Sequence, residues 1–263
     1  MTEKKEYAKA IISMPGCEFH DVIDSTNIRA KELARAGAAE YSCVFADEQT
    51  RGRGRMDRHW LSEAGRGIYM TMIVRPKDTP ASQSPIYSMG ASLAVCDTLS
   101  GFGLSPSIKW PNDVLLDGRK LCGILSEAGL CADGFIDYIA VGIGINVSGT
   151  RFEGLPWACS VESVTEKQPP ARGEIAVSLV QNLKKIFGAI KNNRRRRILD
   201  LVSQRMVTLG KPILAERDGD AVRGTAMKLL DDCSLLMETD EGKELVLIYG
   251  EVSVRGIMGY SPK

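Results

Sequence analysis

The sequence predicts an α+β fold built on a mixed, mostly antiparallel sheet with helices packed against it. Several short apolar segments follow one another between residues 43 and 147, and few helical patterns separate them. A doubly wound parallel sheet would need a helix after each strand, so this order favours the mixed arrangement. From residue 209 the pattern changes to closely spaced short strands. We therefore predict one larger domain over residues 1–208 and a small β-barrel over residues 209–263.

Three helices are predicted in the larger domain. Residues 24–27, Asp-Ser-Thr-Asn, supply capping side chains for a short helix, and Gly37 is placed to end it. Ser84 followed by Pro85 predicts the start of a second helix, whose apolar residues form a stripe on one face. A third helix is predicted over residues 174–190, where apolar residues recur at helical spacing.

The predicted strands are short, apolar and bounded by Gly, Pro, Asn or Asp. In the larger domain they cover residues 43–48, 67–74, 107–110, 120–127 and 135–147. In the smaller domain they cover residues 211–215, 222–230, 234–239, 244–249 and 252–255. Five short strands with turn residues between them are typical of a small barrel.

The charges of the chain nearly balance, with 34 Lys and Arg against 33 Asp and Glu and a formal net charge of +1. No global field therefore draws the chain to nucleic acid or to a membrane surface.

The N-terminus is charged and no apolar run approaches the ~18 residues of a membrane span, so we expect a cytoplasmic protein without a membrane partner. Seven scattered cysteines without a Cys-x-x-Cys pair argue against a disulfide framework or a zinc site. The four arginines at residues 194–197 are interpreted as the solvated face of a helix rather than a nucleic-acid patch.

An arginine- and glycine-rich segment at residues 51–58 follows the first predicted strand. Its two glycines allow the backbone to approach a ligand, and its four arginines can converge on a phosphate or carboxylate. Asp57 stands where a dinucleotide fingerprint needs its third glycine, and the chain contains no P-loop sequence. A flexible basic surface loop is the alternative interpretation.

Residues 109–113 read Lys-Trp-Pro-Asn-Asp, and Lys120 follows closely. The turn presents the amide of Asn112 and the carboxylate of Asp113 together with Lys109 and Lys120. Such groups can hydrogen-bond an adenosine, hold Mg²⁺ and offset negative charge at a reacting phosphate. A hairpin with routine surface ions is the alternative.

Two alternate residues of a third segment, Gly142 and Gly144 in Val-Gly-Ile-Gly-Ile-Asn-Val, lack side chains. Glycines two positions apart open one face of a sheet, so something must pack directly against the backbone there. A flat ligand and a crossing helix would both satisfy this requirement.

Taken in this order, the segments resemble the biotin protein ligase family. The residues that carry the resemblance are Ser25-Thr26-Asn27, Gly52-Arg53-Gly54-Arg55, residues 109–113 with Lys120, Gly123-Ile124-Leu125 and Gly142-Ile143-Gly144-Ile145-Asn146. The resemblance covers about residues 22–148 and extends more weakly through residues 250–255. It implies the family's catalytic fold, which is similar to that of class II aminoacyl-tRNA synthetases, and an SH3-like form for the C-terminal barrel.

The resemblance also implies the site residues. Those expected to contact biotin are Ser25, Thr26, Asn27, Gln49, Gly52, Arg53, Gly54, Arg55, Lys120, Gly123, Gly142 and Gly144. Those expected to contact ATP are Arg53, Arg55, Trp60, Asn112, Asp113, Lys120 and Asn146. The expected catalytic residues are Arg55, Lys109, Lys120 and Asp113, the last as a proton acceptor. The chain departs from the family at Met56 and Asp57, and the added carboxylate would alter loop closure by pairing with a neighbouring arginine.

The activity that the resemblance implies is that of a biotin-(acetyl-CoA-carboxylase) ligase, which forms a C–N bond. It would activate biotin with ATP and Mg²⁺ to biotinyl-5′-AMP, release pyrophosphate, and transfer biotin to a lysine of a biotin carboxyl carrier protein. A lipoate protein ligase-like adenylating transferase is the alternative, and a nucleic-acid-binding module is disfavoured by the charge balance. Some members are also repressors with an N-terminal winged helix. Because only 24 residues precede Ser25, we expect no operator binding and no DNA partner, whereas a homodimer stays open.

Overall fold

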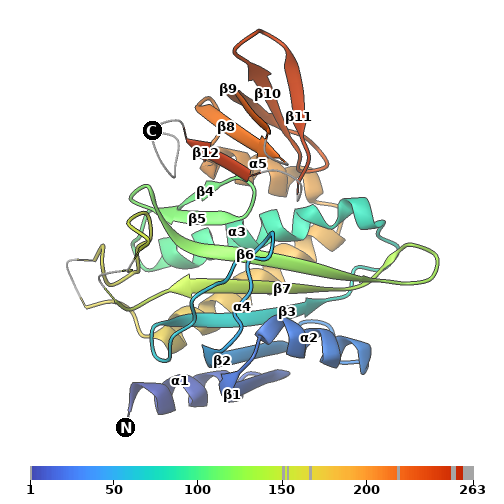
Figure 1. Cartoon of the computed structure of the whole chain (residues 1–263). Coiled ribbons are helices and arrows are strands. Elements are labelled where there is room, and N and C mark those ends of the chain that lie inside the picture. The colour runs from blue at the N-terminus through green and yellow to red at the C-terminus, as the bar shows by residue number, and fades with distance from the viewer. Residues whose placement is uncertain are drawn as a thin grey trace.

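Two sheets and a set of helices make up the molecule (Figure 1). The structure, a computed structural model, describes residues 2–149, 152, 154–165, 168–217, 220–249 and 253–256. Within these residues a seven-stranded sheet extends over residues 17–146 and a five-stranded sheet over residues 212–256. The second sheet stands next to one edge of the first, where β4 (Ser107–Lys109) and β5 (Asp113–Leu116) lie.

The larger sheet is mixed and mostly antiparallel, which confirms the predicted class. Its strand order is β1-β2-β3-β7-β6-β5-β4. β1 (Cys17–Ile23) and β2 (Cys43–Gln49) run parallel, and the other neighbouring pairs are antiparallel. β3 (Gly67–Val74), β7 (Ile136–Asn146) and β6 (Arg119–Leu130) form its centre. Because antiparallel neighbours can be joined by short turns, strand follows strand in this part of the sequence.

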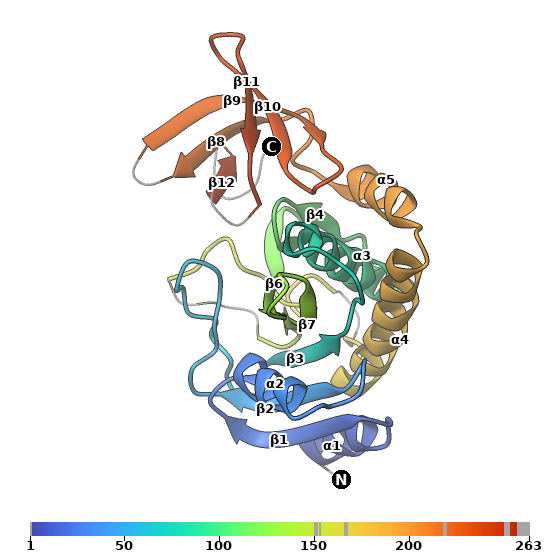
Figure 2. The same cartoon turned by 90° about the vertical axis from the view of Figure 1, so that its right-hand side faces the viewer.

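Helices lie on both faces of the larger sheet (Figure 2). α3 (Pro85–Gly101) and α4 (Arg172–Lys191) cover one face with α5 (Arg195–Arg205) beside them, and α2 (Thr26–Arg35) lies on the other face. The three predicted helices are therefore confirmed, and Gly37, with a φ of +86°, follows the end of α2. None of the helices in the described part of the chain combines the length and apolar character that crossing a membrane requires.

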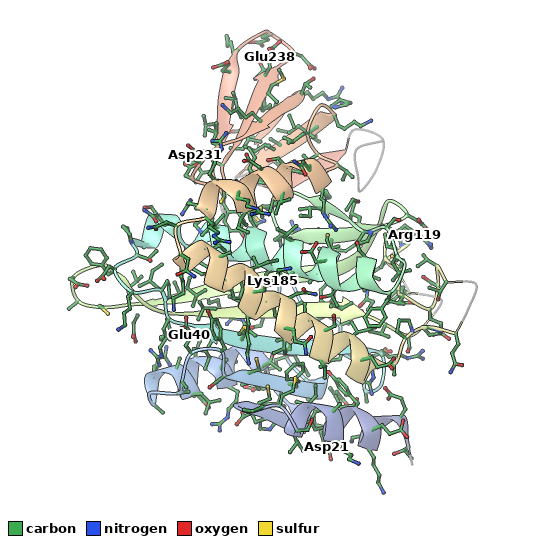
Figure 3. The ribbon with its side chains drawn as sticks, turned by 180° about the vertical axis from the view of Figure 1, so that it is seen from behind. Asp21, Glu40, Arg119, Lys185, Asp231 and Glu238 are labelled. Atoms are coloured by element: carbon green, nitrogen blue, oxygen red, sulfur yellow. The ribbon has the colours of Figure 1, made fainter. Side chains whose placement is uncertain are left out.

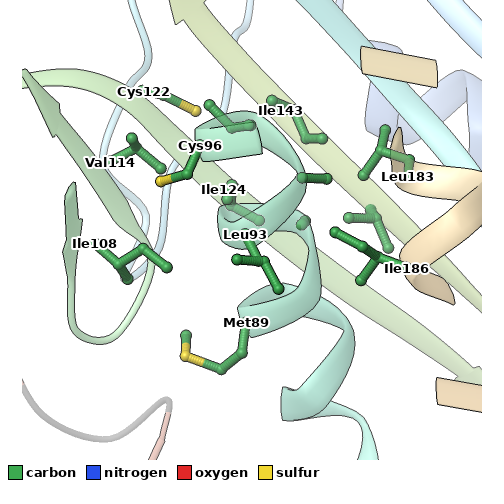
Figure 4. Close-up of a cluster of buried hydrophobic side chains, with 14 of the residues drawn as sticks. Met89, Leu93, Cys96, Ile108, Val114, Cys122, Ile124, Ile143, Leu183 and Ile186 are labelled. Carbon is green, nitrogen blue, oxygen red and sulfur yellow. The ribbon is translucent and has the colours of Figure 1, made fainter. Parts of the chain in front are cut away.

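The main hydrophobic core lies between the helices and the larger sheet (Figure 4). Leu93 and Cys96 of α3 lie among side chains such as Ile124 of β6 and Ile143 of β7. The sequence predicted that α3 buries one side only, but nearly every residue from Ile86 to Leu99 is buried. The helix is enclosed by the sheet, α4 and α5. Even Ser88 is fully buried, and its hydroxyl donates to a serine hydroxyl of β6 at 2.7 Å. α4 keeps the predicted polar outer face, on which Lys185 is exposed (Figure 3).

The sequence predictions lack α1 (Glu3–Ile12), β1, β5 and the short 3₁₀ helix Ala81–Gln83, and they give α5 only as a helix face at residues 194–197. α1 buries only Tyr7 and Ile11 within a highly charged segment, so its apolar signal is weak. β1 is an edge strand without a fully buried residue. α5 begins inside the run of four arginines and buries Ile198, Leu199 and Val202, which confirms that the arginines belong to a solvated helix face.

The C-terminal sheet has the order β11-β10-β9-β8-β12, with antiparallel pairing throughout. Its strands are β8 (Pro212–Arg217), β9 (Asp220–Leu229), β10 (Leu235–Thr239), β11 (Glu244–Leu247) and β12 (Ser253–Gly256), close to the five predicted ones. The sheet is open in this order over the described residues. Residues 250–252, part of the segment that carries the weaker family resemblance, lie outside the described residues.

Trp110 joins the two sheets. Its side chain is fully buried, its indole N–H donates to the carbonyl of Cys233 at 2.9 Å, and its ring meets Tyr249 edge-on with ring centres 6.4 Å apart.

We predict that Trp110→Phe lowers the free energy of unfolding by about 1–3 kcal/mol, because the buried carbonyl loses its donor. Urea unfolding followed by circular dichroism measures this change. Trp157, which is 40% exposed, provides the control, and an equal loss in Trp157→Phe would contradict the assignment.

Candidate active site

One large cavity, with a volume of about 830 Å³, lies between the larger sheet and residues 51–60, here called the arginine loop. This volume is within the range of about 300–1,000 Å³ that small-molecule sites occupy. Except for Gly52, every site residue predicted from the sequence lines the cavity. These residues are Ser25, Thr26, Asn27, Gln49, Arg53, Gly54, Arg55, Trp60, Lys109, Asn112, Asp113, Lys120, Gly123, Gly142, Gly144 and Asn146. The fold thus brings distant segments of the chain to one place.

One end of the cavity carries neutral polar groups. Ser25 stands at the N-cap position of α2, although its side chain does not make the predicted capping hydrogen bond, and Gln49 ends β2. The parallel pairing of β1 with β2 sets these two ends side by side. The backbone N–H of Thr26 donates to Gln49 Oε1 at 2.9 Å, and the Thr26 hydroxyl lies 3.1 Å from the same oxygen. Gln49 Nε2 donates to the hydroxyl of Ser62 at 2.9 Å. Amide and hydroxyl groups can both donate and accept hydrogen bonds, so this end suits a polar, uncharged ring.

The open face at the strand glycines is filled by two side chains that line the cavity. A Cβ added at Gly142 would collide with the Asn27 amide, which α2 places there. A Cβ added at Gly144 would lie 2.5 Å from Trp60 Cε2, and one at Gly123 would lie 2.9 Å from Trp60 Cζ3. The glycines therefore seat Asn27 and Trp60 directly on the sheet backbone, and a ligand in the cavity meets the exposed faces of these side chains.

We predict that Gly144→Ala displaces the indole of Trp60 and raises the KM for ATP about tenfold, since forcing a methyl group into a packed contact costs roughly 1–3 kcal/mol. Steady-state pyrophosphate release measures the KM, and Trp60 fluorescence reports the displacement. Gly188→Ala is the matched control, because an added Cβ there has nothing within 4 Å. A Gly144→Ala protein with an unchanged KM and unchanged fluorescence would show that the close packing of Trp60 against Gly144 is not needed.

The other end of the cavity is cationic. Lys120 Nζ lies 2.7 Å from Asp113 Oδ1 and 5.4 Å from the ring centre of Trp60. Arg55 Nη1 donates to Asn112 Oδ1 at 3.1 Å, and burial lowers the pKa of Arg55 from its usual value. A guanidinium nevertheless keeps its charge in proteins. Lys109 is also buried here, so among the described residues that line the cavity Lys109, Lys120 and Arg55 accompany one carboxylate, that of Asp113. This excess of positive charge suits an anionic ligand such as a phosphate.

The tip of the arginine loop is a tight turn. Gly54 N donates to Arg58 O at 2.7 Å, and Arg53 pairs with His59 in an antiparallel bridge. Met56 and Asp57, the two departures from the family pattern, both have a φ of +54°. Positive φ at both central residues is what a type I′ turn requires, and aspartate tolerates it better than methionine.

Gly52 is the one predicted site residue that does not line the cavity. A Cβ added there would collide with the carbonyl oxygen of Trp60 and lie 2.7 Å from Ser62 Oγ. Trp60 N donates to Gly52 O at 3.0 Å, so the two strands of the arginine loop cross closely at this point. The structure thus gives Gly52 a place in the loop rather than in the cavity wall.

Several residues of the site were not predicted from the sequence. Phe152, Leu155 and Trp157 also line the cavity, and Lys120 N donates to Trp157 O at 2.7 Å. Tyr249 places its ring centre 5.5 Å from the guanidinium carbon of Arg55. These contacts depend on tertiary structure alone. Glu127 also contacts site residues, and its position at the end of the predicted strand 120–127 was the only signal that could have pointed to it.

The fold and the cavity define an enzyme-like protein with a polar pocket at one end and a cationic pocket for a phosphate-bearing group at the other. Residues 19–146 match the Biotin/lipoate A/B protein ligase family. Over 241 residues the chain is 31% identical to the biotin-(acetyl-CoA-carboxylase) ligase of Mycobacterium tuberculosis, a match that spans 88% of this chain and 87% of that protein. The chain therefore belongs to the biotin/lipoate protein ligase family, and its relatives within it are biotin protein ligases.

Other relatives agree with this placement. The chain is 44% identical over 131 residues to the bifunctional ligase/repressor BirA of Bacillus subtilis, and the match spans 49% of this chain but only 40% of that protein. The solved structure of the Aquifex aeolicus biotin protein ligase in complex with biotin and ATP superposes with a TM-score of 0.78 at 26% identity. That superposition covers 92% of this chain and 99% of the Aquifex chain.

Proposed function

We propose that the chain is an ATP-dependent biotin protein ligase. It forms biotinyl-5′-AMP from biotin and ATP with release of pyrophosphate, and then transfers biotin to a lysine of a biotin carboxyl carrier protein. The observation that carries the proposal is the joining of a neutral polar pocket and a cationic pocket in one cavity, as an acyl-nucleotide requires. The names of the relatives, and the complex of the Aquifex enzyme with biotin and ATP, support it.

The first step joins two anions. A carboxylate oxygen of biotin attacks the α-phosphorus of ATP, and the bond to the pyrophosphate oxygen breaks. Two like charges ~4 Å apart repel by roughly 4 kcal/mol at an effective dielectric near 20, so cations must offset this term. Lys120, Arg55 and Lys109 are the cations that we assign to it. Fixed positions in the cavity also align the reacting atoms, which removes much of the entropic cost of their meeting.

Mg²⁺ would be held by Asp113 with help from the phosphates of ATP. Mg²⁺ keeps several waters and binds through one or two carboxylates plus substrate phosphates, so one carboxylate beside a phosphate pocket fits this ion. Among the described residues no group of three His, Cys, Asp or Glu side chains could hold a metal by itself. The bound ion would neutralise charge on the departing pyrophosphate.

In the second step the carrier lysine attacks the carbonyl carbon of the mixed anhydride and AMP leaves. The attacking amine must lose a proton, and Asp113 is our candidate to accept it. Its 2.7 Å contact with Lys120 gives Asp113 a third role in this proposal, besides binding Mg²⁺ and accepting a proton, which is to hold that ammonium group in place. Closure of the arginine loop would keep water from the anhydride until the carrier docks.

The proposal includes an SH3-like barrel for residues 209–263, with its boundary after residue 208. The five-stranded antiparallel sheet beside β4 supports this assignment. The absence of operator binding, a cytoplasmic location and a homodimer stay predictions without support beyond the sequence. A salt titration of DNA binding tests the first, since contacts of several arginines with phosphates would make the affinity fall steeply with salt.

One assay tests the activity. The full chain is incubated with biotin, ATP, Mg²⁺ and a carrier domain, and pyrophosphate release and the carrier mass are followed. We expect pyrophosphate release that depends on biotin and the mass gain of one biotinyl group on one lysine. Lipoate replaces biotin in a parallel reaction, where a faster turnover would favour the lipoate alternative. A chain that neither retains biotin nor releases pyrophosphate would refute the proposal.

A further inference from the structure

Glu127 of β6 contacts two separate segments, α2 and the arginine loop, at the edge of the cavity. Its Oε2 accepts a hydrogen bond from Asn27 Nδ2 at 2.8 Å. Its Oε1 accepts from Lys31 Nζ of α2 at 2.7 Å and from Arg53 Nη1 of the arginine loop at 3.1 Å. A single carboxylate therefore links two residues of α2, one of which lines the cavity, to the arginine loop.

The Asn27 contact fixes the orientation of an amide that is almost fully buried. The second proton of Asn27 Nδ2 goes to Leu125 O at 3.2 Å, and Asn27 Oδ1 accepts from the Thr71 hydroxyl at 2.6 Å. The two donors of the amide are thus both used within the chain, which leaves Asn27 as a support of the cavity wall. Thr71 Oγ1 lies 2.9 Å from Thr26 Oγ1, so the network continues into the polar pocket.

The same network reaches the arginine loop at both of its ends. At one end Arg53, 41% of whose side chain is exposed, pairs with Glu127. At the other end Gln49 donates to the Ser62 hydroxyl, which in turn donates to Trp60 O at 3.2 Å. The two ends of the loop are consequently fastened to the residues of the polar pocket, one through charge and one through neutral hydrogen bonds.

We propose that Glu127 is a positioning residue that fastens the arginine loop over the cavity through Arg53 and orients Asn27 against the sheet. The inference rests on the proposed function, because the loop is the element that would retain the adenylate. A glutamine at this position could still accept a hydrogen bond from Asn27, but its neutral amide would not hold Arg53. An alanine would release both partners.

The carboxylate carries its charge at neutral pH. Burial raises the pKa of Glu127, but hydrogen bonds from Lys31 and Asn27 and the charges of Lys31 and Arg53 outweigh burial and leave the pKa below its usual value. A depressed pKa means that the contact persists above the ordinary range of a glutamic acid and weakens only as the pH falls through the lowered value.

Trypsin tests the fastening without any ligand, because the arginine loop contains several cleavage sites. We expect Glu127→Gln to speed cleavage within residues 51–60 roughly two- to fivefold, the effect of one partly exposed ion pair. Lys31→Gln is the matched control, since it removes the other cation of Glu127 and leaves the pair with Arg53. In an Arg53→Gln background the Glu127→Gln change should have no further effect on cleavage at the remaining arginines. Equal cleavage of wild type and Glu127→Gln, or an effect that persists without Arg53, would overturn the proposal.

Measurements of adenylate retention and of the KM for biotin separate the two roles of Glu127, which are to fasten Arg53 and to orient Asn27. We expect Glu127→Gln to shorten adenylate retention by a similar factor while the KM for biotin stays within about twofold. Glu127→Ala should in addition raise the KM for biotin, about tenfold, because a hydrogen bond to a charged group is lost at Asn27. A uniform loss in both variants would indicate a merely structural role. A wild-type chain that releases no pyrophosphate would refute the proposed function and leave the trypsin result intact.

Discussion

Replacing Lys120 with alanine is expected to lower the rate of biotin-dependent pyrophosphate release by about 10²–10³-fold, the cost of removing one preorganised charge from a reacting phosphate. The ammonium group of Lys120 is held by Asp113 at 2.7 Å, and it lies beside the ring of Trp60. Its loss would also leave the Asp113 carboxylate facing two further anions. Pre-steady-state measurement of pyrophosphate release separates this effect from the later transfer to the carrier.

Lys185→Ala is the control for this prediction. Lys185 is exposed on the outer face of α4, which covers the sheet face opposite the arginine loop (Figures 2 and 3). Its removal should leave the rate unchanged. Lys120→Arg should recover part of the activity, since the charge remains although its geometry changes. If Lys120→Ala releases pyrophosphate at the wild-type rate, the cationic end of the cavity does not bind the reacting phosphate.

The second large effect is expected from Arg55→Gly, which should speed the escape of biotinyl-5′-AMP about ten- to hundredfold. Arg55 ties the arginine loop to the turn at Asn112 through a charge-assisted hydrogen bond of 3.1 Å and stacks near Tyr249. Such a bond contributes roughly 1.5–3 kcal/mol, which corresponds to this range of rates. The escaped anhydride would then label lysines of bystander proteins.

Arg51→Gly is the matched control, because Arg51 belongs to the same loop but does not line the cavity. It introduces the same glycine and the same loss of charge. Adenylate retention is measured by rapid filtration with labelled biotin, and bystander labelling is measured by mass spectrometry of added serum albumin. If the two variants retain the adenylate equally well, closure of the loop does not depend on Arg55.

Sequence patterns predicted the elements with strong local signals. The fully buried β3 was predicted with its bounds, and α4 nearly so, because a continuous apolar run or apolar residues at period 3.6 leave a signature within a short window. β1 and α1 lack that signature, since an edge strand and a highly charged helix bury few residues. The one-sided stripe predicted for α3 failed for a related reason. How many sides of a helix are covered depends on elements that are distant in the sequence.

Many residues of the cavity wall could likewise be predicted from the sequence. The contacts between their side chains could not. Except for Gly52, every site residue that the family resemblance implied, from Ser25 to Asn146, lines the cavity. The need for close packing at Gly142 and Gly144 could also be predicted. Which groups pack there, Asn27 and Trp60, could not, because a helix and a loop had to be placed over the sheet first.

The sequence by itself determined the class of fold, the positions of the strong helices and strands, and many of the residues that line the cavity. Only the tertiary structure decided which of them touch. The register that sets Leu125 and Thr71 on either side of Gly142 brings Glu127, Asn27 and Arg53 into one hydrogen-bonded group. Local propensities act over a few residues, but such contacts join positions about a hundred residues apart, and the pairing of whole strands is what brings them together.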